Sequence, residues 1–241
     1  MSVEVRNWRG ARDIPLTPIE GRYARIVPLD LRRHGGDLWE AFGGTAETVS
    51  KHLRHTGLPH FDGRDAFFRA FATASRATLL HRLARPFRRR RPRRLYFALI
   101  DKASGRATGV RCLSAIDYVH GSVELALSAV GGSMRRATGS TEVAYLMGSM
   151  VFDTCGFRRY ECHIALDNEA ALQHIARIGW HRDGVIRQRY VHDGRSADVA
   201  VFTLLAQEWP PIRDAYRAWL DPSNFDAAGR QIRRLEDFRN P

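Results

Sequence analysis

The sequence predicts one α+β (mixed α/β) domain with a central sheet and helices around it. Apolar-rich runs joined by short glycine turns between residues 95 and 128 are typical of an antiparallel meander. A helix, a strand, a second helix and a closing hairpin then occur in order between residues 140 and 205. At 241 residues the chain is long enough to bury a full core, and we find no internal repeat.

The first part of the chain is expected to hold one strand and several helices. Tyr23–Leu29 is the first strand candidate. The segment up to Asp65 is expected to be helical in pieces, with Thr45 capping a helix over Ala46–Leu53. Apolar residues at helical spacing predict an amphipathic helix over Asp65–Leu83.

The meander and the C-terminal half of the chain are easier to divide. The meander strands are expected at Leu95–Asp101, Thr108–Asp117 and Ser122–Ser128. A helix over Ser140–Cys155 should end at Gly156, and Asn168 should cap a helix over Glu169–Ile178. The remaining elements are a strand at Tyr160–Leu166, a hairpin of Val185–Tyr190 with Asp198–Leu205, and a helix at Glu208–Leu220.

The charge favours an anionic partner. The chain holds 38 Lys and Arg against 26 Asp and Glu, a formal net charge of +12. Because 36 of the 38 are arginine, part of this excess reflects the bias of a GC-rich genome. The strongest run reads as an exposed loop and is a candidate nucleic-acid contact; it comprises Arg88, Arg89, Arg90, Arg91, Arg93 and Arg94.

Cysteine usage and hydropathy indicate the cellular compartment in which the protein is expected. Cys112, Cys155 and Cys162 form no C-x-x-C pair, which favours reduced thiols and no structural zinc. No run of 18 apolar residues occurs, and the N-terminus is charged, so we expect a cytoplasmic protein without membrane contact. No His/Glu spacing indicates a metal site, and either a monomer or a homodimer is expected.

Four groups of motifs occur in a fixed order between Tyr96 and Gln231. They are Asp101–Gly105 with Gly109; Thr141-Glu142 before an apolar helix; Phe152-Asp153 and Gly156–Arg159, then Asn168 and Gly179-Trp180; and Gln207–Pro210 with Trp219-Leu220 and Asn224–Asp226. In this order they resemble the GNAT superfamily of N-acyltransferases. The closest likeness is to its ribosomal-protein-alanine N-acetyltransferase-like branch.

The resemblance implies the GNAT acyltransferase fold, a mixed sheet that splays between two parallel strands, here Ser122–Ser128 and Tyr160–Leu166. It divides the chain into an N-terminal arm (1–22), the acyltransferase domain (23–206) and a C-terminal helix and tail (207–241). Its co-substrate would be acetyl-CoA or another acyl-CoA, with no metal. The acceptor would be a small-molecule or peptide amine.

A basic, glycine-containing turn before a helix is suited to hold a pyrophosphate. The residues expected to bind the cofactor there are Arg135, Arg136, Ala137, Thr138, Gly139, Ser140 and Thr141. The family's turn is Gln/Arg-x-x-Gly-x-Gly/Ala, and two registers compete, one starting at Arg135 and one at Arg136. Asn168 is a candidate to hydrogen-bond the pantetheine of the cofactor or, as a catalytic residue, the reacting centre, although a plain helix cap would explain it equally well.

Acyl transfer needs a neutral amine, a polarised carbonyl and a stabilised leaving group. Glu124 is the candidate base, against the alternative of an ordinary solvent-facing strand residue. The N–H groups near Leu127 and Ser128 are candidates to polarise the acyl oxygen. His163 is a candidate acid, although a plain strand residue is the simpler interpretation. The usual proton donors are absent, because Ile175 and Ala171 stand where the family carries tyrosine and serine.

Three functions remain open at this point. The first is direct acyl transfer from acyl-CoA to a primary amine. The second is aminoacyl transfer from an aminoacyl-tRNA on the same fold, which the missing side-chain acids and the arginine run would fit. The third is an inactive GNAT-like domain that binds nucleic acid through its basic surface.

Overall fold

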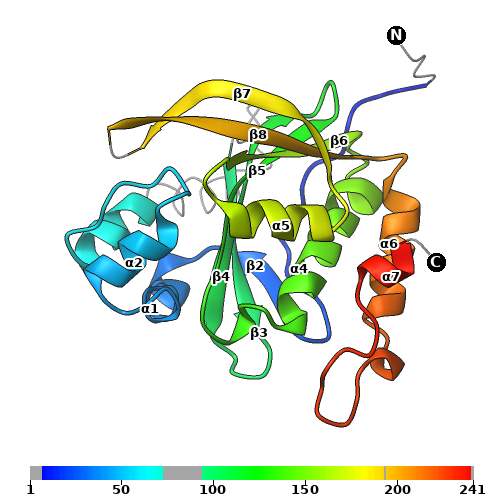
Figure 1. The fold of residues 1–241 in the computed structure, drawn as a ribbon, viewed down its shortest axis with the longest axis horizontal. Helices are drawn as coiled ribbons and strands as arrows, with labels where there is room; N and C mark the ends of the chain where they lie inside the picture. Colours follow the sequence, from blue (N-terminus) through cyan, green and yellow to red (C-terminus); the bar gives the residue numbers. More distant parts are fainter. Residues whose placement is uncertain (1–6, 73–93, 193, 240–241) are drawn as a thin grey trace.

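The computed structural model of the protein describes residues 7–72, 94–192 and 194–239 (Figure 1). Its centre is an eight-stranded sheet with the order β1-β2-β3-β4-β5-β6-β8-β7. Among the described strands only β5 and β6 pair in parallel, and the other neighbours are antiparallel. The strands are β1 Ile19–Glu20, β2 Ala24–Pro28, β3 Arg94–Asp101, β4 Ala107–Asp117, β5 Ser122–Val130, β6 Arg159–Ala165, β7 His181–His192 and β8 Arg195–Leu205.

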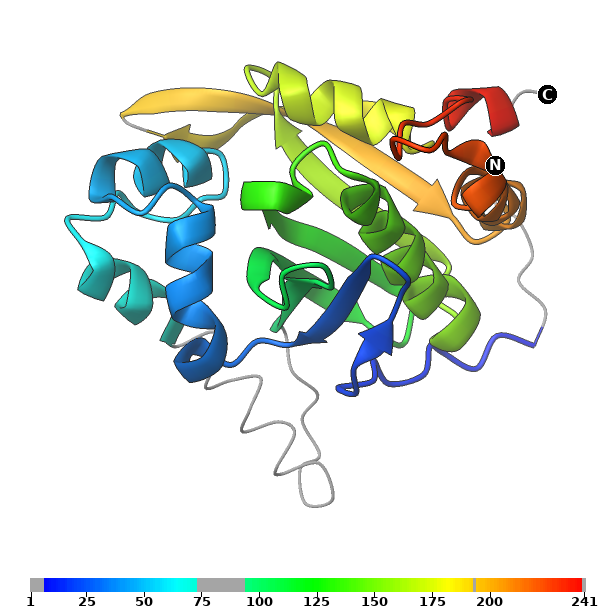
Figure 2. The same cartoon turned by 90° about the horizontal axis from the view of Figure 1, so that it is seen from below.

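Helices cover both faces of the sheet (Figures 1 and 2). On one face α1 (Leu31–Ala41), α2 (Ala46–Leu53) and a helix at residues 64–72 enclose an aromatic-rich core around Phe67. On the other, α4 (Thr138–Ser149), α5 (Glu169–Arg177) and α6 (Trp209–Trp219) enclose a second core. The short α7 (Glu236–Arg239) packs against α6. No helix in the described ranges is both long and apolar enough to cross a bilayer.

The predicted fold class is confirmed, and so are most of the predicted elements. Thr45 caps α2 in a reciprocal capping box with Thr48. Asn168 caps α5 by accepting the Ala171 N–H at 3.3 Å. The expected helix Ser140–Cys155 is α-helical only to Ser149 and ends in a π-helical turn, Met150–Thr154.

Other elements differ from the prediction. The closing hairpin is longer than expected, because β7 begins at His181. The short strand β1 lies in the segment expected to be an extended arm, and α1 had no predicted bounds. The segment 73–83 of the expected helix lies outside the described residues, as do Arg88, Arg89, Arg90, Arg91 and Arg93 of the arginine run; Arg94 opens β3.

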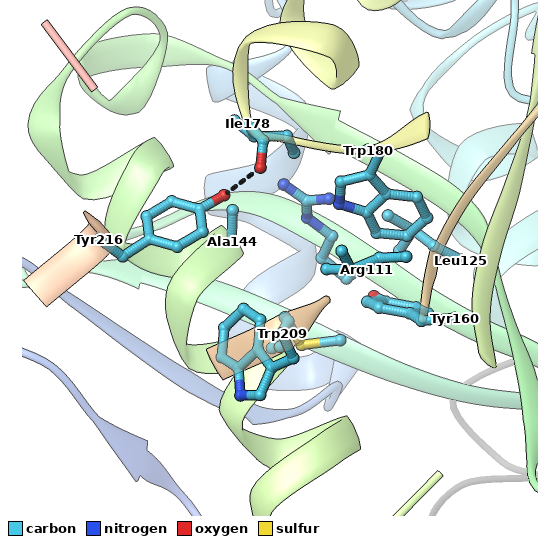
Figure 3. A pocket seen from close by; sticks show the side chains of 11 residues that line it. Arg111, Leu125, Ala144, Tyr160, Ile178, Trp180, Trp209 and Tyr216 are labelled. Carbon is cyan, nitrogen blue, oxygen red and sulfur yellow. Dashed lines mark hydrogen bonds between the residues drawn. The ribbon is translucent and has the colours of Figure 1, made fainter. Parts of the chain in front are cut away.

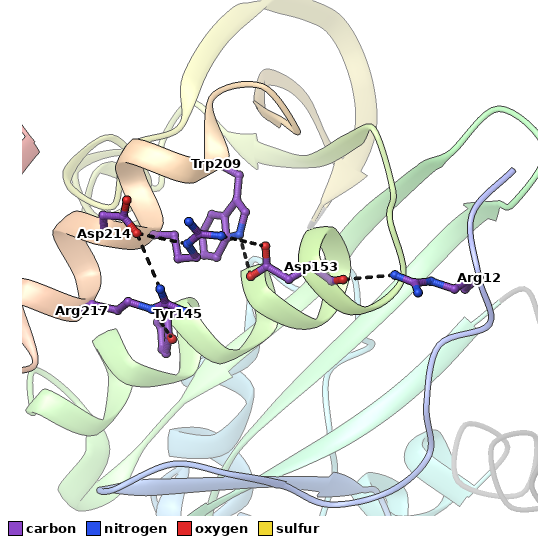
Figure 4. A network of polar contacts seen from close by, with 7 residues as sticks. Arg12, Tyr145, Asp153, Trp209, Asp214 and Arg217 are labelled. Carbon is purple, nitrogen blue, oxygen red and sulfur yellow. Dashed lines mark hydrogen bonds and ion pairs between the residues drawn. The ribbon is translucent and has the colours of Figure 1, made fainter. Parts of the chain in front are cut away.

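The N-terminal segment and α6 are joined to α4 by polar contacts around Asp153 (Figure 4). The Asp153 carboxylate accepts from the Trp209 indole N–H at 3.0 Å and pairs with Arg213 at 3.3 Å. Its backbone carbonyl accepts from the Arg12 guanidinium at 3.1 Å. Segments distant in sequence therefore meet at the C-terminal end of α4.

The other end of α4 is attached to β2 through one buried carboxylate. Glu142, in the second turn of α4, accepts the backbone N–H groups of Arg22, Tyr23 and Ala24 at 2.6, 2.7 and 2.7 Å. Its side chain is buried, with the residue 5% exposed. Backbone donors that a bending strand would leave unpaired are thus satisfied, and the start of α4 is held at the sheet.

Candidate active site

The site begins where β5 and β6 separate. They pair over only three positions, namely Ser122 with Arg159, Val123 with Tyr160 and Glu124 with Glu161. Beyond Glu124 the strands diverge, although β5 continues to Val130 and β6 to Ala165. The predicted splay is therefore present, and no described strand lies beside the backbone edge of β6 on this side from Cys162 onward.

A cleft of about 1350 Å³ opens from this splay. It is larger than the roughly 300–1,000 Å³ of common small-molecule pockets, so a long ligand fits it. Its walls are α2, β5, the turn before α4, β6, α5 and the segment around Arg230. Seven of the described lining residues are Lys or Arg, and no described lining residue is Asp or Glu; the cations are Lys51, Arg54, Arg111, Arg135, Arg136, Arg177 and Arg230.

The turn before α4 forms one end of the cleft. A single 3₁₀ turn, Gly132–Met134, leads into it, and Arg136 adopts the left-handed conformation at φ 61°. No described side chain caps α4, so the N–H groups of its first turn and the positive end of its dipole are available to an anion. Of the seven residues predicted at this turn, all except Gly139 line the cleft.

Gly139 lies on the other side of the turn. A Cβ built there would be 3.6 Å from the Met134 side chain and 3.7 Å from that of Tyr23, on the core side. Thr138 and Ser140 do line the cleft. This geometry favours the register that starts at Arg135, with Thr138 and Ser140 at the two positions where the family carries small residues.

Glu124 and His163 meet next to the point where the strands part. Glu124 lies opposite Glu161, and His163 comes two residues later on the same face of β6. The His163 Nδ1 is 3.4 Å from one Glu124 oxygen, close enough for an ion pair but not aligned as a hydrogen bond. The other Glu124 oxygen accepts from the Ser114 hydroxyl at 2.8 Å. His163 lines the cleft, and Glu124 lies behind it.

The strand β5 has a bulge just beyond Glu124. Cys112 pairs with Leu127 and the next residue, Leu113, pairs with Leu125, so Ala126 is the extra residue. A bulge leaves the ladder locally open. The predicted donors near Leu127 and Ser128 lie directly beyond it, and both residues line the cleft.

Across the cleft, α5 presents few polar side chains. Asn168 lines the cleft while its Oδ1 caps the helix. Ala171 and Ile175 also line it, without a hydroxyl between them. His174 is the remaining titratable side chain besides Arg177, and burial, with Arg111 and Arg177 nearby, lowers its pKa to about 4. It is therefore neutral at physiological pH.

The thiols are unsuited to nucleophilic chemistry. Burial raises the pKa of Cys112 and Cys155 to about 11 and that of Cys162 to about 12. Thiolates are the reactive form, so these side chains are inert at neutral pH. Among the described residues no cluster of three or more His, Cys, Asp or Glu could hold a metal ion.

Solved structures of other proteins share this fold. A GCN5-related N-acetyltransferase from Brucella melitensis superposes with a TM-score of 0.86 at 32% identity, over 98% of this chain and 100% of that one. The chain belongs to the GCN5-related N-acetyltransferase (GNAT) family. It is an N-acyltransferase.

Solved GNAT structures with lower sequence identity to this chain share the same fold. A probable GNAT acetyltransferase from Chromobacterium violaceum superposes at TM-score 0.72 and 26% identity, over 87% of this chain and 96% of that one. A spermidine N-acetyltransferase from Vibrio cholerae, solved with CoA and spermine, shares the fold at TM-score 0.58 and 15% identity, over 78% and 99% of the two chains. No family model and no curated protein matches the sequence.

Several cleft residues of this GNAT enzyme were not predicted from the sequence. The wall formed by α2 contributes Lys51, His52 and Arg54, and the sheet contributes Arg111. The α2 residues carried no chemical pattern, because only the folded chain brings α2 to the cleft. Arg111 did carry a sequence signal: it is the one charged residue among the first eight of β4, ATGVRCLS.

Proposed function

We propose that this enzyme transfers an acyl group from an acyl-CoA to a primary amine by direct attack. The observation that carries the proposal is the splay of β5 from β6, which opens into a cleft lined by seven cations and no described acid. A CoA molecule combines a pyrophosphate with a long, flexible arm. The positive charge of the cleft suits the pyrophosphate, and its volume suits the flexible arm.

The pyrophosphate would bind at the turn before α4. The uncapped first turn supplies N–H donors, and Arg135 and Arg136 supply positive charge. The pantetheine arm would then lie along the free edge of β6, where Cys162–Ala165 all line the cleft. Its amides would add to the sheet as an extra strand does. Asn168 has a free amide NH₂ among the described contacts and is positioned to donate to it.

The Glu124–His163 pair would take the proton from the attacking amine. Glu124 is the base, and His163 is the group through which it reaches the cleft. The Ser114 hydrogen bond fixes the carboxylate so that its other oxygen faces the imidazole. The acyl oxygen would accept from N–H groups at the bulge next to Leu127 and Ser128.

The acceptor class is inferred from the sequence resemblance. We propose that the acceptor is an exposed peptide α-amine, such as the N-terminal alanine of a ribosomal protein. The C-terminal motifs that carry this likeness include Trp219 and Phe225, and both residues line the cleft. A polyamine is the competing acceptor. Its positive charge would meet the cationic lining, which weakens that alternative.

An aminoacyl-tRNA is the competing donor, because the basic lining would also suit RNA phosphates. Calorimetry with CoA, against a deacylated tRNA at several salt concentrations, separates the donors. Micromolar CoA binding supports the proposal. Binding of tRNA without CoA binding would contradict it.

The catalytic assignment is tested by Glu124→Gln and His163→Gln. Each should lower kcat by about a hundredfold or more and leave CoA affinity unchanged. The matched control is Glu161→Gln, which removes the carboxylate directly opposite Glu124 on β6 and should change kcat by less than about threefold. Wild-type turnover in both the Glu124→Gln and the His163→Gln protein would refute the assignment.

A further inference from the structure

Arg111 occupies an unusual position for an arginine. It lies within β4, opposite Ser128 of β5, between Val110 and Cys112. Those two neighbours face the core under α1 and α2, so the Arg111 side chain extends to the opposite face, toward α4, α5 and α6. The residue is only 4% exposed.

No described acid compensates this buried charge. Arg111 projects toward Ile178 and Trp180, and the eleven residues around the small cavity there include no Asp or Glu (Figure 3). Its Nε has no hydrogen-bond partner in the described structure, and neither does the nearby Tyr160 hydroxyl. Burial lowers the pKa of Arg111. A buried, unpaired guanidinium is costly, so its presence calls for an anion that the folded chain does not itself supply.

The titratable groups that face Arg111 cannot serve as that anion. They come from β6, α5 and α6, and are Tyr160, Cys162, His174 and Tyr216, with Arg177 beside His174. Burial raises the pKa of Tyr160, Cys162 and Tyr216, so these groups stay neutral. The two α5 groups are neutral or cationic.

Arg111 also lines the large cleft, together with Leu125, Cys162 and Ile175. Glu124 and Ser114 lie on the other face of the sheet, the face of Cys112. The base and the unpaired cation therefore flank the splay from opposite sides. This arrangement suits a reaction that releases a proton on one side and negative charge on the other.

We propose that Arg111 stabilises the thiolate that leaves when the thioester is cleaved. This inference rests on the proposed acyl-CoA donor. The amine nitrogen forms a bond to the acyl carbon, the C–S bond breaks, and its electron pair stays on sulfur. The amine proton passes to the Glu124–His163 pair, and Arg111 keeps its own protons. The Glu124–His163 pair then releases its proton to solvent and the thiolate takes one from solvent, which yields CoA and the amide and restores the base.

The inference predicts a perturbed thiol in the enzyme–CoA complex. A cation beside the sulfur lowers the thiol pKa, by about one unit or more from about 8.5. The ultraviolet absorbance of the thiolate, recorded against the desulfo-CoA complex, measures that pKa directly. The protein's own thiols do not interfere below pH 10, since burial raises the pKa of Cys112, Cys155 and Cys162 to about 11, 11 and 12.

Variants assign the effect to Arg111. Arg111→Met should return the thiol pKa to its free value or above, and Arg111→Lys should keep at least half of the shift. Arg135→Met, at the pyrophosphate turn, is the matched control: it should weaken CoA binding without moving the thiol pKa. In turnover, Arg111→Met should lower kcat most for donors with the most basic thiol leaving groups.

The thiol pKa of CoA bound to the wild-type enzyme tests the role of Arg111 even if the Arg111→Met protein fails to fold. A bound-thiol pKa at or above that of free CoA would overturn the role of Arg111. Absence of CoA binding in calorimetry would instead overturn the donor assignment, so the two failures are distinguishable. A lowered thiol pKa that persists in Arg111→Met would also overturn the inference.

Discussion

Replacing Glu142 with glutamine should destabilise the protein more than any surface substitution nearby. Glu142 accepts three backbone N–H groups, from Arg22 through one oxygen and from Tyr23 and Ala24 through the other. A glutamine side chain keeps one acceptor oxygen and places an NH₂ group against the remaining donor. One bond is lost, and two bonds become neutral ones.

These three hydrogen bonds determine how much unfolding free energy the Glu142→Gln protein loses. A hydrogen bond to a charged group contributes about 1.5–3 kcal/mol and a neutral one about 1 kcal/mol. Two of the donors are only partly buried, so water compensates part of the loss. We expect a total of about 2–4 kcal/mol, from a typical stability of about 5–15 kcal/mol. For a chain of this length that lowers Tm by about 5–15 °C.

Urea unfolding followed by circular dichroism measures this loss, with calorimetry for Tm. The control is Glu20→Gln in the β1–β2 hairpin, whose backbone N–H groups Glu142 accepts. The Glu20 side chain is 55% exposed and pairs with Arg25 and Lys102 at the surface. That change should cost less than about 1 kcal/mol. A Glu142→Gln protein within 0.5 kcal/mol of wild type, on the order of measurement error, would refute the reasoning.

Gly139→Ala should be neutral or stabilise α4 by up to about 1 kcal/mol with unchanged CoA affinity, because the new Cβ meets only ordinary contacts on the core side. Gly148→Ala should cost about 1–3 kcal/mol in thermal unfolding, because its Cβ would clash with the Trp209 ring. His174 stays neutral in the folded state down to pH about 4, whereas the unfolded side chain gains a proton near 6.5. Stability should therefore fall by about 3 kcal/mol between pH 6.5 and 4, and His174→Gln should flatten that slope in urea titrations.

Much of the fold was readable because its signals are local. The glycine turns of the meander, the capping threonine at Thr45 and the asparagine at Asn168 each fix their own neighbourhood. The ladder that ends at Glu124 is not a local property. It entered the prediction only through the likeness to a family, and the structure confirms it.

The site was only partly predictable for the same reason. The turn before α4 is contiguous in sequence, so a candidate set could be named, with Gly139 as the one member that faces away from the cleft. Arg111 and His174 are brought together by β4 and α5 packing across the sheet. Burial, not spacing, gives these two residues their chemistry, and burial is known only once the chain is folded.

The Glu142 contact also constrains the order in which the protein can fold. Its partners Arg22, Tyr23 and Ala24 are separated from it by 118–120 residues. During synthesis at about 5–20 residues per second, β2 therefore waits several seconds or more for α4. Until then β3 can already pair with the edge of β2, but the face of β2 that carries Ala24 and Ile26 lacks the α4 residues that cover it. Loss of this one carboxylate, which holds α4 against β2, should consequently appear first as aggregation of newly made chains.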